Sequence, residues 1–419
     1  MLFGVQHLFL MLPATVLAPI LLANGLGLSA ATTTVLVTAT LFAAGLATLF
    51  QGLGWFGIGA RLPVVQGTEL YFIPPLVALG ASSGTGSIAF SVCLGGLLTL
   101  FIGRIYKNIE KLFPPLVIGT IITLIGIYLI PVGINLLLGQ HTPQYGTYKP
   151  LLIGVTTFFT IVVCSLYLPG ILGSMSILFG IAVGYVLSLS LGIVNFSPVA
   201  GAGWLSLPDL LPLGFDVPDL SALPVVVMIL FLFVVTAIET TGYVVTTNEI
   251  AGGDPDNANQ KIKHGLAADG LGSVLAGLLG STPQTAYAQN LGAVAITKVA
   301  SRHVSIYAGG IILFLGFVPK IGAIFSTIPS PVMGGALLML FGTISAIGIQ
   351  TLIPVLNKQR NLMILAASLA IGAGFGLAPD EGLAFLGTNG KNALQMGVAI
   401  GALSAVILNL IAPESKEGA

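Results

Sequence analysis

Long apolar stretches recur along almost the whole chain, and they constrain its fold more than any other feature. An α-helix needs roughly 17–25 residues to cross the hydrocarbon core of a bilayer. Eleven stretches reach this length: 5–24, 31–51, 86–103, 112–131, 150–168, 170–194, 222–243, 304–325, 331–350, 361–378 and 393–411. We therefore expect an all-α polytopic membrane protein.

Three further stretches bring the expected number of spans to fourteen. One is a short apolar stretch at 265–280, and two others, 66–80 and 281–297, are interrupted by Gly, Pro and polar residues. Lys and Arg are enriched in the cytoplasmic loops of membrane proteins. With the N-terminus inside, fourteen spans place eleven Lys and Arg residues in the cytoplasm and three outside. This asymmetry supports the count and predicts that both termini are cytoplasmic.

Only 7% of the residues are charged, against about 25% in soluble domains. So few charged groups cannot cover the surface of a soluble protein, so lipid must form part of the solvent. A net charge of zero without a basic stretch argues against nucleic-acid binding. The sequence has neither a metal-ligating Cys/His spacing nor a phosphate loop ending in Gly-Lys-Ser/Thr. We therefore expect no enzyme, no cofactor and no ATP-driven transport.

The two halves of the chain resemble each other. Residues 113–119 open one expected span and residues 328–334 open another 215 residues later, with Pro, Val and Gly at matching places. The same offset carries the interrupted stretch after Arg61 onto the one near Pro283. Chance is an alternative in a chain this rich in Pro and Gly. Seven spans per half make the second copy enter from the opposite side, as in carriers that bind solute near the midplane.

The two interrupted stretches are where we expect the solute site. Residues 62–72 and 280–292 place Pro, Gly, amides and hydroxyls within apolar sequence. A broken span leaves backbone groups without helical partners, which is tolerated only where protein or a water-filled cavity satisfies them. β-Branched and aromatic residues in the first break favour a short extended piece. We expect two extended pieces that face each other, with helix ends directed at the gap.

Ionisable side chains inside the expected spans are few, and each is a functional candidate. Glu239 follows an apolar stretch and lies either within the membrane or at its interface. Asp269 precedes a short span, where a helix N-cap is equally consistent. Glu69 lies in the first break and either binds backbone N–H groups or contacts the solute. For His7, at the start of the first span, a hydrogen-bonded packing role is the simpler interpretation.

Two adjacent amides, Gln289 and Asn290, lie in the second break. A primary amide offers a donor and an acceptor together, which suits the edge of a heterocycle. The alternative is that these side chains satisfy backbone groups of the break, and we favour that role for Asn290.

Residues 289–298 resemble the signature of the nucleobase–ascorbate transporter family: Gln or Glu, Asn, any residue, Gly, four residues, Thr and often a basic residue. Gln6-His7, residues 61–67, Ala268-Asp269-Gly270 and residues 281–283 match further parts of the family pattern in the right order. The resemblance covers nearly the whole chain.

The resemblance implies fourteen spans in a 7+7 inverted repeat, with short extended pieces in broken spans 3 and 10. A core domain would comprise 1–103 and 222–327, and a gate domain 104–221 and 328–419. Members move uracil, xanthine or uric acid, in bacteria commonly with protons, and tend to be homodimers. We therefore expect a proton symporter of the inner membrane with alternating access, in which the core moves against the gate as an elevator.

The resemblance also implies the roles of the site residues. Glu239 and Gln289 would hydrogen-bond the base, because its edge alternates N–H and C=O groups. The remaining candidates would line the pocket, support it or couple protons to it. The lining set is Ala14, Leu70, Tyr287, Ala288 and Tyr243, and the supporting or coupling set is Asp269, His7, Glu69 and Asn290, with Glu239 as the main coupling group.

The sequence leaves the identity of the base open. Gln289 together with Asp269 resembles xanthine and uric acid carriers more than uracil carriers. Tyr243 and Leu291 depart from the usual family pattern, so uracil or another planar amide is an alternative. An anion transporter or channel of the related sulfate-carrier fold is an alternative of another class, which the carboxyl group of Glu239 disfavours.

Overall fold

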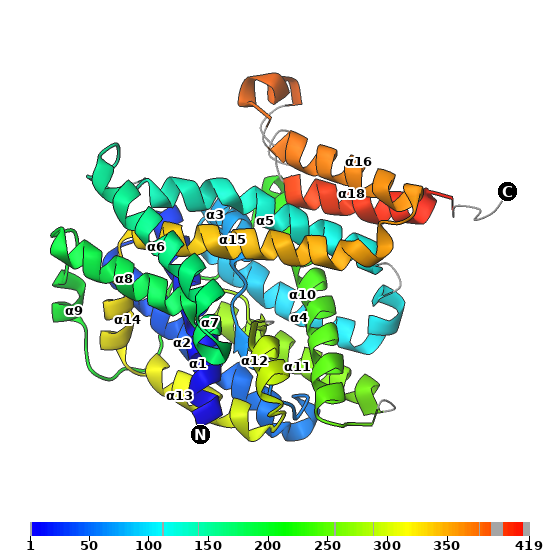
Figure 1. The fold of residues 1–419 in the computed structure, drawn as a ribbon, viewed down its shortest axis with the longest axis horizontal. Helices are drawn as coiled ribbons and strands as arrows, with labels where there is room; N and C mark the ends of the chain where they lie inside the picture. Colours follow the sequence, from blue (N-terminus) through cyan, green and yellow to red (C-terminus); the bar gives the residue numbers. More distant parts are fainter. Residues whose placement is uncertain are drawn as a thin grey trace. The chain divides into compact units, whose positions relative to one another are not determined.

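The computed structural model is built almost entirely from helices (Figure 1). It describes residues 2–110, 113–140, 142–254, 257–287, 289–376, 378–386 and 397–413. The helices are α1 (Leu2–Gly25), α2 (Ala30–Leu53), α3 (Ile73–Ser83), α4 (Gly86–Glu110), α5 (Pro115–Leu137), α6 (Tyr148–Tyr167), α7 (Gly170–Ser174), α8 (Ser176–Ser190), α9 (Ser197–Gly201), α10 (Leu223–Ile250), α11 (Ala258–Leu278), α12 (Gln289–Thr297), α13 (His303–Gly316), α14 (Pro319–Ser326), α15 (Ser330–Leu352), α16 (Gln359–Gly376) and α18 (Gly397–Ile411). The described strands are β1 (Gln66–Gly67) and β2 (Thr285–Ala286).

Seven of the described helices are long and apolar enough to cross a membrane: α1, α2, α4, α5, α6, α10 and α15. The bent pair α13 and α14 adds an eighth if it is counted as one span. These helices confirm the prediction of a mostly helical, polytopic membrane protein. The total of fourteen spans and their inverted repeat stay predictions.

One expected span is not a single straight helix. The apolar stretch 304–325 is divided into α13 and α14, which are bent by 83° relative to each other. Pro319 begins α14, while α13 already ends at Gly316. Because proline has no N–H and its ring clashes with the preceding turn, it is favoured at the start of a helix and disfavoured inside one. The bend is therefore placed by Pro319, although hydropathy alone gives one continuous stretch.

The chain divides into two compact units. Unit 1 comprises Met1–Tyr106 and Phe159–Pro329, and unit 2 comprises Lys107–Phe158 and Ser330–Ala419. Each unit thus combines a segment from the first half of the chain with one from the second half. The units differ from the expected core and gate bounds over residues 159–221, and the division into core and gate domains stays a prediction.

Unit 2 is organised around the closely packed pair α5 and α15, against which α16 and α18 lie (Figure 1). Glycines permit the close approach. A Cβ atom on Gly126 would lie 2.5 Å from Ser345 N, and one on Gly348 would lie 2.4 Å from Thr123 N. Small residues at such contacts let helix backbones approach in membranes, where packing rather than the hydrophobic effect holds helices together.

Unit 1 is organised around α2, which packs against α1, α11, α13 and α14. A Cβ atom on Gly45 would lie only 2.4 Å from Leu313 N, so α2 and α13 also meet through a small residue. Large apolar side chains face outward from the same unit: Leu97, Phe101, Leu166 and Phe314 are each more than half exposed. Such exposure suits a lipid-facing surface and supports the membrane assignment.

Candidate functional site

The two predicted breaks meet in unit 1 as a two-stranded antiparallel ladder. Gln66 pairs with Ala286 and Gly67 with Thr285, and the Tyr287 N–H donates to Val65 O at 2.9 Å. The ladder satisfies backbone groups that a broken helix would otherwise leave without partners. Helix α3 follows β1 after one 3-10 turn, and α12 follows β2. The prediction of two facing extended pieces is confirmed.

Hydroxyl and amide side chains complete the hydrogen bonding of the breaks. Thr48 Oγ1 accepts from the Gln66 N–H at 2.9 Å. Ser273 Oγ donates to Gln284 O at 2.8 Å and accepts from the Gln284 N–H at 3.0 Å. Gln284 Nε2 donates to Thr68 Oγ1 at 3.1 Å. The polar residues of α2 and α11 therefore hold the extended pieces in place, which explains their presence in apolar helices.

Asp269, on α11, is the centre of this network, and its carboxyl group is buried. Five donors from four elements, α2, β1, α10 and β2, surround it. They are Gln51 Nε2 at 2.8 Å and Gln66 Nε2 at 2.6 Å on Oδ1, the Thr240 and Thr285 hydroxyls on Oδ2, and the Ala286 N–H. A carboxylate has about four lone-pair sites. Because protein donors fill them, the geometry favours a supporting role for Asp269 and leaves little capacity for direct solute contact.

A second carboxyl group, Glu239 on α10, has a different environment. It is half-buried, and Tyr71 Oη donates to its Oε2 at 2.9 Å. Tyr71 lies in the 3-10 turn Leu70–Phe72 that connects β1 to α3. Glu69 precedes this turn, is buried, and interacts electrostatically with Glu239. Two carboxyl groups and one phenol therefore gather beside the end of the ladder.

The residues expected to line the pocket are all buried where the structure describes them. Ala14, Leu70 and Tyr287 are at most 4% exposed. Helix α1 closes on the ladder here, because a Cβ atom on Gly67 would lie 2.8 Å from Thr15 Oγ1 and 3.2 Å from Tyr287 Cδ2. Only glycine fits between these side chains. Tyr287 thus approaches the first strand from the second break.

Tyr243 takes a structural contact. Its Oη donates to Pro63 O at 3.3 Å, and the ring is buried. The carbonyl it binds belongs to the first break, where no helical N–H is available. Tyr243 therefore has the geometry of a group that supports the break, and its place in the pocket lining stays a prediction.

His7 and Asn290 connect α1 to α12. Asn290 Nδ2 donates to His7 O at 3.2 Å, and both side chains are buried. Five buried atoms near the ladder lack a hydrogen-bond partner within the described ranges: His7 Nδ1, Asn290 Oδ1, Thr15 Oγ1, Gln66 Oε1 and Gln284 Oε1. Because buried polar atoms are almost always satisfied, these atoms point to water or a polar solute at the site.

Two of the predicted site residues fall outside what the structure describes. They are Ala288 and the side chain of Gln289, whose backbone begins α12. Two other contributors were not anticipated from the sequence: Gln51 and Thr240. Each is a polar group at the end of, or inside, an apolar stretch, which is the one signal that could have identified them.

Comparison with known proteins agrees with these features. The profile described as the Permease family matches residues 1–381. A Clostridium perfringens protein named as a purine permease is 37% identical over 419 residues, covering 99% of this chain and 90% of the relative. A uric acid permease of Bacillus subtilis is 33% identical over 413 residues, covering 98% of this chain and 94% of the relative. The resemblance to nucleobase carriers is confirmed.

Solved structures share the fold at low sequence identity. The transmembrane domain of a cyanobacterial bicarbonate transporter matches with a TM-score of 0.59 at 15% identity, covering 97% of each chain. A murine anion transporter of the Solute Carrier 26 family, in an inward-facing state, matches with a TM-score of 0.65 at 13% identity, covering 98% of this chain and 68% of the other. These likenesses concern architecture alone.

Proposed function

Because this chain belongs to the Permease family, which includes uric acid and xanthine permeases, we propose that it carries a purine base such as xanthine or uric acid. The observation that carries the proposal is the contact between Tyr71 and Glu239 beside the paired breaks. It leaves a carboxyl group with free acceptor capacity at the point where two half-helices begin.

The chemistry of a purine base matches this arrangement. Xanthine and uric acid are planar and present ring N–H donors and C=O acceptors along their edges. Glu239 Oε1 and the unused lone pairs of Oε2 accept from ring N–H groups, and the Tyr287 phenol and the Gln289 amide are the proposed partners of the carbonyls. Where a site is built to hydrogen-bond its ligand, analogues that lack the matching group are rejected by up to roughly 10⁴-fold.

We further propose that proton symport drives accumulation. Two carboxyl groups that interact inside the membrane repel each other when both are charged. One proton shared between Glu69 and Glu239 removes the repulsion and leaves acceptor oxygens for the base. Binding of the base and of the proton then favour each other, which links their movement across the membrane. Asp269, His7 and Asn290 support this arrangement from behind the ladder.

The proposed transport cycle follows from the family architecture. Core spans within 1–103 and 222–327 would move the base past gate spans within 104–221 and 328–419, in an elevator-type alternation. The protein would act as a homodimer in the inner membrane, with both termini in the cytoplasm. The asymmetry of Lys and Arg in the sequence supports this orientation.

Uptake into proteoliposomes tests the proposal. Radiolabelled xanthine or uric acid is offered to wild-type protein under an imposed proton gradient. We expect Glu239→Gln to abolish gradient-driven accumulation, because an amide cannot take up the coupled proton. Glu249→Gln is the matched control, since Glu249 is exposed on the same helix. Undiminished accumulation in Glu239→Gln would refute the coupling role.

A competition panel addresses the two alternatives. Unlabelled uric acid, xanthine and uracil are compared as inhibitors of uptake, and strongest inhibition by uracil would move the assignment to a uracil permease. The structural neighbours are anion transporters, so sulfate and bicarbonate fluxes are measured in the same vesicles. Sulfate has no N–H donors for the carboxyl oxygens of Glu69 and Glu239 and is repelled by their negative charge, whereas a purine base donates ring N–H groups to them.

A further inference from the structure

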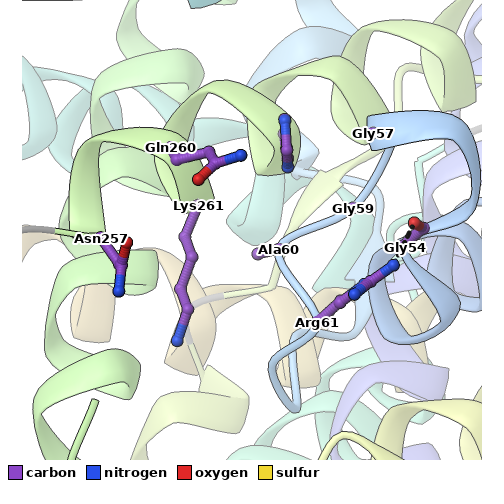
Figure 2. A pocket seen from close by; sticks show the side chains of 9 residues that line it. Gly54, Gly57, Gly59, Ala60, Arg61, Asn257, Gln260 and Lys261 are labelled. Atoms are coloured by element: carbon purple, nitrogen blue, oxygen red, sulfur yellow. Dashed lines mark hydrogen bonds between the residues drawn. The ribbon is translucent and has the colours of Figure 1, made fainter. Parts of the chain in front are cut away.

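We propose that a cavity between the α2–β1 connection and the first turns of α11 is a binding site for a phosphate-bearing anion. The cavity is distinct from the site of the proposed transport function, on which this inference does not depend. It has a volume of about 360 Å³ and is lined by both segments, including Arg61, Lys261 and His264 (Figure 2). This volume is within the range of small-molecule sites.

The positive charge of two lining side chains, Arg61 and Lys261, favours an anionic ligand. Arg61 comes from the connection and Lys261 from α11, so two cations separated by 200 residues in sequence line one cavity, with Arg61 lying beside Gly54 (Figure 2). Arg61 Nη2 donates to Gly54 O at 3.3 Å, and Lys261 Nζ donates to Asn248 Oδ1 at 2.5 Å. Both acceptors are neutral, so these bonds orient the cations without compensating their charge. Arginine and lysine with these donors are suited to phosphate oxygens.

Neutral donors add to the cavity. The Asn257 and Gln260 amides and the His264 ring contribute to its lining, and α11 begins at Ala258, where the side chain of the N-cap residue Asn257 makes no capping hydrogen bond. The positive end of a helix dipole favours an anion. Among the described residues, the Asp254 carboxylate lies beside the lining, because Asn257 Nδ2 donates to its Oδ2 at 3.3 Å. The two cations outweigh it.

The connection is built to hold this shape. The Gly59 N–H donates to His264 O at 2.7 Å, and the Arg61 N–H donates to Gln51 O at 2.9 Å. A Cβ atom on Gly59, whose φ is +109°, would lie 1.9 Å from Phe50 O, so only glycine fits there. Arg61 itself has a φ of +55°, which is uncommon outside glycine. The positive-inside rule accounts for the side on which these cations lie but not for their shared place in the lining of one cavity.

The cavity also connects to the buried network around Asp269. Gln51 Oε1 accepts from the Ala60 N–H at 3.0 Å, and Gln51 Nε2 donates to Asp269 Oδ1 at 2.8 Å. Ala60 lines the cavity. One side chain therefore joins the wall of the cavity to the carboxylate that anchors both strands. An anion that changes the position of Ala60 would act on the ladder through Gln51.

The phosphate group has two possible sources, a lipid headgroup and a soluble phosphate ester. Trp55 and Phe56, in the same connection, are 57% and 101% exposed, and aromatic side chains of this kind are enriched at membrane interfaces. Both sources present the same oxygens to Arg61 and Lys261. The experiment therefore measures both.

Binding to the purified full-length protein in neutral detergent tests the site. Inorganic phosphate is titrated into the protein, and its binding is measured by calorimetry. In a second measurement, the protein is placed in nanodiscs that contain phosphatidylglycerol or phosphatidylcholine, and native mass spectrometry identifies the lipid that it retains. We expect Lys261→Gln and Arg61→Gln each to weaken binding of the phosphate ligand about tenfold or more, as expected for loss of one charged partner. Lys261→Arg, which keeps the charge, should restore binding.

Lys263→Gln is the matched control, because Lys263 is an exposed cation two residues along the same helix and does not line the cavity. Its affinity for the phosphate ligand should be within twofold of the wild-type affinity.

Selective retention of phosphatidylglycerol assigns the site to a headgroup, and binding of inorganic phosphate in lipid-free detergent assigns it to a soluble anion. The proposal is overturned if neither ligand binds wild type, or if Lys261→Gln and Lys263→Gln bind alike. The melting temperature of each variant establishes that a loss of binding is not a loss of fold.

Discussion

Thr240→Val tests whether the donors around Asp269 stabilise the paired breaks. Thr240 is fully buried on α10, and its hydroxyl donates to Asp269 Oδ2. Valine has nearly the same shape, so the substitution removes a donor without opening a cavity. A hydrogen bond to a charged group contributes roughly 1.5–3 kcal/mol. Since Asp269 keeps four other donors, we expect the lower part of this range, a loss of about 1.5–2 kcal/mol.

Thr236→Val is the control for this substitution. Thr236 lies one turn earlier on the same helix and is also buried, but its hydroxyl donates only to Phe233 O at 3.0 Å in its own helix. Such back-bonding contributes little to stability, so we expect a change within about 0.5 kcal/mol.

Thermal unfolding of the detergent-purified variants provides the measurement. Thr240→Val should lower the melting temperature by several degrees relative to Thr236→Val. If the two variants melt together, the network around Asp269 does not stabilise the fold as its geometry indicates.

The other predictions concern the solute contact and the helix packing. Tyr71→Phe removes the donor to Glu239 and should weaken base binding about tenfold, because a hydrogen bond to a charged group contributes roughly 1.5–3 kcal/mol and we expect the lower end of this range. A competition binding assay with unlabelled base measures the affinity. Unchanged affinity would contradict the role of this contact. Gly348→Ala should destabilise the protein by about 1–3 kcal/mol through overpacking against Thr123. Gly342→Ala on the same helix has open space at the Cβ position and should melt at or above the wild-type temperature.

Sequence alone identified the two breaks because their physical cause is local. Pro, Gly and polar groups within an apolar stretch cannot continue a helix in lipid without partners, and the extended pieces they predict do pair. The resemblance to known carriers then placed Glu239 and Asp269 in one site. Both inferences rest on patterns that are contiguous in the chain.

The partners of those residues could not be predicted in the same way. Gln51 and Asp269 are 218 residues apart in the sequence, and Tyr71 and Glu239 are 168 residues apart. In the sequence, Gln51 looks like any polar residue at the end of a helix, and nothing near it indicates a contact with Asp269. The bend at Pro319 was missed for a related reason, since hydropathy averages over a window and does not register one proline.

The roles of the Asp269 and Glu239 carboxyl groups can be separated by counting the donors that each accepts from. Asp269 accepts from five protein donors on α2, β1, α10 and the second break, so a solute could bind it only by displacing bonds that hold the ladder. Glu239 accepts from Tyr71 within the described residues, which leaves most of its lone pairs available. A carboxyl group with satisfied lone pairs is costly to disturb, whereas one with unused acceptors gains by binding an N–H donor. We therefore infer that Asp269 fixes the geometry of the paired breaks and that Glu239 recognises the solute. Substitution of Asp269 should consequently lower stability before it changes selectivity, and substitution of Glu239 should do the reverse.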